Sequence, residues 1–70
     1  MKALDIIAER IDMLKGQFAM TFDRARISEA GYGPEDGVTK LLYLDAAVLN
    51  ARLTELETLF QVVDNHATDR

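Results

Sequence analysis

The chain has 70 residues, a net charge of -4, a pI near 4.7 and no cysteine. A single domain of this size buries little surface, so it usually needs a disulfide, a metal or a partner chain for stability. The absence of cysteine excludes disulfides and thiolate metal sites, and the acidic balance argues against a general affinity for nucleic acid or anionic lipid. Association with another chain is the stabilising device that remains.

The sequence predicts a single domain over residues 1–70, because it has no internal repeat and no linker long enough to separate two domains. No apolar run reaches the roughly 18 to 20 residues that a transmembrane helix needs. Asp5 interrupts the N-terminal stretch before an apolar signal region forms. We therefore expect a cytoplasmic protein with no membrane contact.

Residues 3–29 are predicted to form the first helix. Apolar residues follow one another at spacings of three and four, interrupted only at Thr21, which is typical of a coiled-coil-like seam. These seam residues are Leu4, Ile7, Ile11, Leu14, Phe18 and Ala25. A second apolar set recurs every seven residues on another side of the same helix, namely Ile6, Met13, Met20 and Ile27. One neighbouring helix cannot cover both sides, so something else must cover the second.

Residues 30–36 are predicted to form a turn, because three glycines and a proline cluster around it. We expect Gly31 to close the first helix, since glycine readily takes positive φ there, and Pro34 to lie in the first turn of the next helix. A second helix is predicted over residues 37–66. Its seam is Leu42, Ala46, Leu49, Leu53, Leu56, Phe60, Val63 and Ala67. The predicted fold is therefore all-α, an antiparallel two-helix hairpin that dimerises into a four-helix bundle.

Turn length and seam agree on one register, in which the numbers of facing residues add to 67, as for Leu14 and Leu53. A shift by one heptad would leave no room for the turn or would add about seven residues to it. The flanking pairs that this register brings together are Arg24 with Asp45 and Phe22 with Tyr43.

The second apolar side is predicted to be a homodimer interface, formed by Ile6, Met13, Met20, Ile27, Leu41 and Val48. The alternative is a docking surface for a different protein, in which the methionines provide an adaptable patch. Gly16 lies inside the first helix, where simple tolerance, close approach of another helix and a bend all remain open.

Catalytic and metal-binding patterns are weak. Asp5, Glu9 and Asp12 share one side of the first helix, but the Glu-x-x-His pairs of di-metal bundles are absent. His66 has no serine or cysteine in register with it. We therefore expect a protein that is not an enzyme and that uses no cofactor or metal.

The turn end is predicted to bind a partner, because aromatic and apolar side chains crowd it beyond the needs of the seam. The partner-binding residues are expected to be Tyr32, Tyr43, Leu44, Glu55 and Glu57, with the two acids as a rim. The favoured function is a protein–protein interaction module, a small acidic dimeric regulator or inhibitor of a larger bacterial or phage-related machine. Its acidic second helix would occupy a basic groove that normally holds nucleic acid.

Heptad-spaced seams in both predicted helices give an architecture that resembles the plasmid copy-number regulators of the Rop type, which are dimers of helical hairpins. The resemblance implies an RNA-binding dimer as an alternative function. Arg10, Arg24 and Arg26 would then contact the RNA. A structural subunit of a larger assembly and a secretion chaperone are further alternatives, since fold alone does not establish function.

Overall fold

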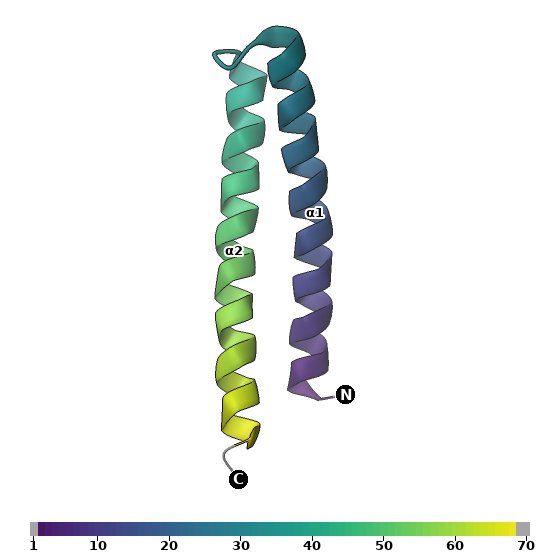
Figure 1. Ribbon diagram of the computed structural model, residues 1–70, viewed down its shortest axis with the longest axis vertical. Coiled ribbons are helices and arrows are strands. Elements are labelled where there is room, and N and C mark those ends of the chain that lie inside the picture. The colour runs from purple at the N-terminus through teal and green to yellow at the C-terminus, as the bar shows by residue number, and fades with distance from the viewer. Residues whose placement is uncertain (1, 69–70) are drawn as a thin grey trace.

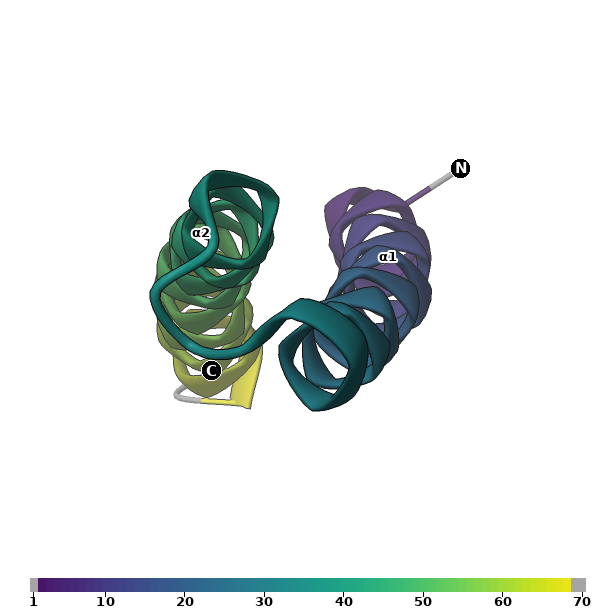
Figure 2. The same cartoon turned by 90° about the horizontal axis from the view of Figure 1, so that it is seen from above.

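The computed structural model describes the backbone of residues 2–68 and the side chains of residues 2–66. Two helices, α1 (Ala3–Tyr32) and α2 (Gly37–Thr68), pack against each other as an antiparallel hairpin (Figure 1). The rod measures 54 by 17 by 12 Å. Seen along the rod, the two helices lie side by side in a single layer (Figure 2). The predicted all-α helical hairpin is confirmed.

α1 continues three residues beyond its predicted end. Gly31, which was expected to close the helix, lies within it, and Gly33 follows the last helical residue with a φ of 92°. The Gly33 N–H donates to the carbonyl of Glu29 at 2.8 Å and so closes the last turn. Both glycines have the freedom that such a position requires, so composition alone does not choose between them.

α2 begins at an N-cap formed by Asp36. The Oδ2 atom of this residue accepts hydrogen bonds from the backbone N–H groups of Val38, at 3.0 Å, and Thr39, at 3.2 Å. These are two of the N–H groups that a helix cannot satisfy internally at its first turn. Pro34, which would also suit the first turn of a helix, lies in the turn before the cap and within the predicted turn of residues 30–36. The connection is thus residues 33–36.

A single seam joins the two helices. All the predicted seam side chains that the structure describes are buried or half-buried, and Ile11, Ala25, Ala46 and Leu53 are the buried apolar ones. Ala67 lies outside the described side chains. Apolar burial along this seam is the main source of stability that the hairpin itself provides.

A polar pair that the sequence analysis did not predict extends the seam toward the turn. The hydroxyl groups of Ser28 and Thr39 share a hydrogen bond 2.6 Å long, and Thr39 is completely buried. A buried hydroxyl needs such a partner to offset the loss of water. The numbers of these two residues add to 67, so the bond confirms the predicted register.

The flanking pairs have different outcomes. The rings of Phe22 and Tyr43 meet edge to face with centroids 5.8 Å apart, as the register predicts. Arg24 and Asp45 form no ion pair, and the salt bridge among the described residues joins Lys40 to Glu35 at 2.9 Å. Both Arg24 and Asp45 are exposed, so water competes for their charges and little energy favours their pairing.

Replacing Leu53 with alanine is expected to lower the free energy of unfolding by about 2 to 5 kcal/mol, because Leu53 is only 8% exposed at the centre of the seam. Urea denaturation followed by circular dichroism measures the loss. Leu44→Ala is the matched control, since Leu44 is 61% exposed and its truncation should change stability by less than about 0.5 kcal/mol. Equal losses in the two variants would contradict the assigned seam.

Candidate functional site

The two broad sides of the hairpin differ in chemistry. Along a coiled-coil-like seam, residues seven apart stay on the same side of their helix. One flank of each helix carries large apolar side chains that are exposed, and these are Ile6, Met13, Met20, Ile27, Val38, Leu41, Val48, Leu59 and Val62. They are nine of the twelve large apolar side chains exposed in the described part of the chain, so the exposure is strongly one-sided.

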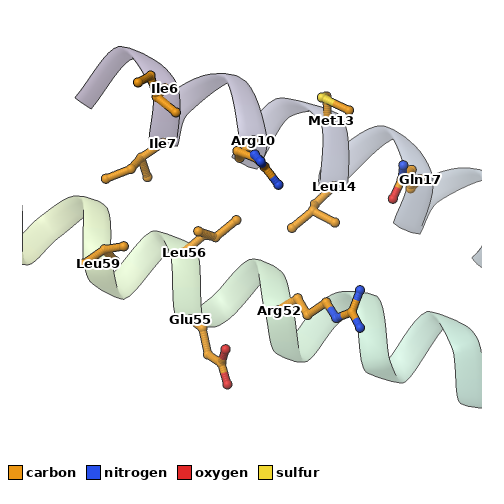
Figure 3. A pocket seen from close by; sticks show the side chains of 10 residues that line it. All are labelled: Ile6, Ile7, Arg10, Met13, Leu14, Gln17, Arg52, Glu55, Leu56 and Leu59. Atoms are coloured by element: carbon orange, nitrogen blue, oxygen red, sulfur yellow. The ribbon is translucent and has the colours of Figure 1, made fainter. Parts of the chain in front are cut away.

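An open trough of about 610 Å³ shows that the two apolar flanks lie on the same side of the hairpin. Ile6 and Met13 line it from α1, and Glu55 and Leu59 line it from α2 (Figure 3). Seam residues such as Leu14 lie between these two walls. We call this side, defined by the nine exposed residues above, the apolar face.

The opposite side is polar. A smaller trough of about 270 Å³ lies there, and its lining includes Asp12, Lys15, Glu57 and Gln61. Charged and amide side chains of this kind remain hydrated without a partner. We call this side the polar face. Because its side chains are well hydrated, the apolar exposure of the opposite side is a specific feature of that side.

The six residues predicted to form a dimer interface all follow the heptad positions of the apolar face. Met13 and Met20, for example, keep 62% and 60% of their surface exposed. Contiguous exposed apolar surface on a small protein commonly marks an interaction site. The structure thus brings the six together on one side, and the identity of what covers them stays a prediction.

Val38, Leu59 and Val62 belong to the apolar face but were not predicted. The sequence did contain a pattern that could have identified them, because they share with Leu41 and Val48 a spacing of three and four along α2. Charged residues between them, such as Asp45, interrupt the pattern and hide it.

Five charged residues are interspersed on the apolar face, at the positions that its heptads leave open. They are Arg10 and Arg24 on α1, and Asp45, Arg52 and Glu55 on α2. Arg10, Arg52 and Glu55 line the large trough. Within the described part of the chain, none of the five forms a salt bridge with another residue. Their charges are therefore available to a molecule that covers the face.

The predicted partner-binding residues do not form one patch. Tyr32, at the last position of α1, is 78% exposed, and Leu44 is exposed on the outer edge of α2. Tyr43 is half-buried and packs against Phe22. The two acids of the expected rim line different sides, Glu55 the apolar trough and Glu57 the polar one.

Tyr43 is held by a contact across the seam. Its hydroxyl donates a hydrogen bond to Oε1 of Glu29 at 3.1 Å. Partial burial raises the pKa of Tyr43, the hydrogen bond and charge of Glu29 raise it further, and Arg26 offsets part of this rise. The phenol therefore stays protonated, and the bond intact, across the neutral pH range.

Gly16 has no close neighbour. Nothing lies within 4 Å of the position that a Cβ atom would take there, among the described residues. Close approach by α2 is therefore not the reason for this glycine, and its exposed position fits simple tolerance.

The described residues offer little for chemistry. They contain no group of three or more histidine, aspartate or glutamate side chains placed to hold a metal ion. Neither helix, as far as it is described, combines the length and apolar character needed to span a bilayer. What the arrangement does offer is surface for association.

Comparisons with protein families, with curated proteins and with solved structures find no match for this chain. Its function must therefore be inferred from the surfaces of the hairpin.

Tyr43→Phe is expected to be less stable than the parent at neutral pH, because it lacks the hydrogen bond to Glu29. The raised pKa means that this stabilisation is fully present below the unfolded-state value, about 10, and is lost as the pH rises through the higher folded-state value. Urea unfolding between about pH 7 and pH 11 should show the difference shrinking at the alkaline end.

Tyr32→Phe is the control for this pH series, because Tyr32 is exposed and its hydroxyl has no described hydrogen bond. It should follow the parent at every pH. A Tyr43→Phe difference that stays constant up to pH 11 would show that the Glu29 contact contributes nothing.

Proposed function

We propose that this chain is a non-enzymatic interaction module, a helical hairpin that forms a homodimer through its apolar face and binds another protein. The observation that carries the proposal is the one-sided exposure of nine large apolar side chains opposite a polar face. Water would otherwise cover this surface at a considerable cost in free energy.

A second copy suits the apolar face because it offers the same elongated shape and the same apolar heptads. Face-to-face packing of two hairpins gives every helix two neighbours, which is the arrangement of a four-helix bundle. The polar faces then become the outer surface. Dimerisation also supplies the stabilising device that a cysteine-free chain of 70 residues otherwise lacks.

The distribution of charge favours a protein over a nucleic acid as the target of the dimer. Residues 31–70 carry seven acidic and three basic side chains, which accounts for the whole net charge of -4. Such a surface complements a basic one and repels nucleic acid. Tyr32, displayed at the turn end, is the kind of side chain that anchors protein interfaces. We propose the role of a regulator or inhibitor of a larger machine.

RNA binding is less favoured by the geometry. Arg10 lines the trough of the apolar face. The positive charge of Arg26 lowers the pKa of Tyr43, so Arg26 lies near Tyr43, on the side of the hairpin opposite the apolar face. Arginines on different sides of the hairpin do not form the continuous basic strip that follows a phosphate backbone.

A variant with Met13→Glu and Met20→Glu is expected to be a monomer, because each change puts a charge into a face that dimerisation would desolvate. Sedimentation equilibrium should give the mass of two chains for the parent and of one chain for the variant. Partial helicity should remain, since the seam is unchanged.

The matched control is Lys15→Glu with Ala19→Glu, which adds two glutamates to the same helix away from the apolar heptads. This control should keep the mass of two chains. A parent that sediments as one chain at micromolar concentration would overturn the proposed dimer.

Tyr32→Ser is expected to abolish capture of the target while leaving the dimer intact. Tyr32 is chosen over Tyr43 because it makes no packing contact that its loss would disturb. Affinity capture from the native host, with mass spectrometry of the bound proteins, compares the parent with Tyr32→Ser and Tyr32→Phe. A dimeric Tyr32→Ser variant that captures the same proteins as the parent would remove the turn end from the proposed binding site.

A further inference from the structure

Two copies of this hairpin can pack their apolar faces together in two symmetric ways. In the same-end arrangement, the two-fold axis runs along the rod, both turns lie at one end, and α1 of each copy packs on α2 of the other. In the opposite-end arrangement, the axis crosses the rod, the turns lie at opposite ends, and each helix packs on its own counterpart. The two differ in which charges meet.

We propose that the apolar face binds a second copy of the chain in the same-end arrangement. The inference rests on the proposed homodimer and adds its geometry. It is carried by four of the five charged residues of the apolar face, which have no salt-bridge partner within the described part of their own chain. Arg52, the fifth, has no acid opposite it on the apolar face of α1 in this arrangement.

The register of the hairpin assigns each of these charges a height along the rod. The Ser28–Thr39 bond places residues whose numbers add to about 67 at the same height. Arg24 and Asp45 therefore share one height. Arg10 and Glu55 share another, about 14 residues away toward the open end, and both line the trough.

In the same-end arrangement, residues of α1 meet residues of the other copy's α2 at the same height. Arg24 then faces Asp45 of the second copy, and Arg10 faces Glu55 of the second copy. Each contact pairs opposite charges, and two-fold symmetry makes it twice. The apolar heptads fit this arrangement, with Met20 facing Val48 and Ile27 facing Leu41, but they do not discriminate, because in the opposite-end arrangement Met20 meets Met13 and Ile27 meets Ile6.

In the opposite-end arrangement, complete overlap of the two rods reverses the heights. Arg24 then faces Arg10 of the second copy, and Asp45 faces Glu55 of the second copy. Like charges meet at both places. Arg52 lies three residues before Glu55 on the covering α2, so it offsets part of the repulsion around Asp45. Arg24 and Arg10 have no such relief, because the apolar face of α1 carries no acid. Because like charges brought together during desolvation oppose association strongly, the charges select the same-end dimer.

Reversing the charge of single residues tests the arrangement, because the two alternatives predict opposite changes in the dissociation constant. Arg24→Glu and Asp45→Arg should each raise the dissociation constant of the same-end dimer by about tenfold or more, since each creates two like-charge contacts. An equimolar mixture of the two variants should form heterodimers with near-parental affinity. In each heterodimer one contact is exchanged, new glutamate against new arginine, and the other is the original pair.

The opposite-end dimer would behave in the reverse way. Arg24→Glu would relieve a repulsion there and tighten self-association, and the mixture would show no preference for heterodimers. Sedimentation equilibrium with one variant carrying a mass tag distinguishes these results. Lys15→Glu, on the polar face, is the control that should leave the dissociation constant unchanged.

A distance measurement keeps the proposal testable even where a charge variant folds poorly. The chain has no cysteine, so Glu35→Cys introduces a single site for a spin label in the turn, away from the apolar face. Two labels should lie within about 30 Å in the same-end dimer, because a bundle is about two helix diameters wide. A separation close to the 54 Å length of the rod would overturn the arrangement. A parent that is monomeric in the same experiment would instead overturn the dimer itself.

Discussion

The packing of α1 on α2 covers only one side of each helix. The small core of the hairpin and its exposed apolar face both follow from this one-sided contact. Apart from Thr39, the described residues that become buried are Ile11, Ala25, Ala46 and Leu53. Since hydrophobic stabilisation grows with the apolar area removed from water, so short a list leaves the isolated hairpin with a small margin against unfolding. Burial of a second apolar surface would add to this margin, and the apolar face is a surface of that kind.

In the proposed dimer, affinity and geometry would depend on different residues of the apolar face. Its methionines and branched aliphatic residues supply area, which favours association with little regard for orientation. Its arginines and acids add little net energy, but they distinguish one orientation from another because they occupy defined heights. The polar face has neither property, and its Phe22–Tyr43–Glu29 contacts serve the hairpin itself.

The seam and its register could be predicted because they depend on a regular spacing of apolar residues, and many residues of the chain follow that spacing. The end of α1 could not, since Gly31 and Gly33 carry the same local signal. The Ser28–Thr39 pair was missed because two hydroxyl residues in a seam look like a break in an apolar pattern until they are seen to satisfy each other. The partner-binding set was chosen by its place at the turn end and on the second helix, without regard to the side of the helix, yet successive residues of a helix point about 100° apart.

The turn residues Gly33 and Pro34 also bear on which chain α2 pairs with. If residues 33–36 were helical, α1 would run into α2 as one helix of about 66 residues, roughly 100 Å long. Two residues oppose this: Gly33 has a positive φ, and Pro34 cannot make the backbone hydrogen bond of a helix interior. Eleven residues separate Ser28 from Thr39, which is close to three helical turns, so the seam would continue almost without offset along such a rod. Two rods could then exchange halves and satisfy every seam contact between chains. The positive φ of Gly33 and the proline that follows it therefore oppose domain swapping.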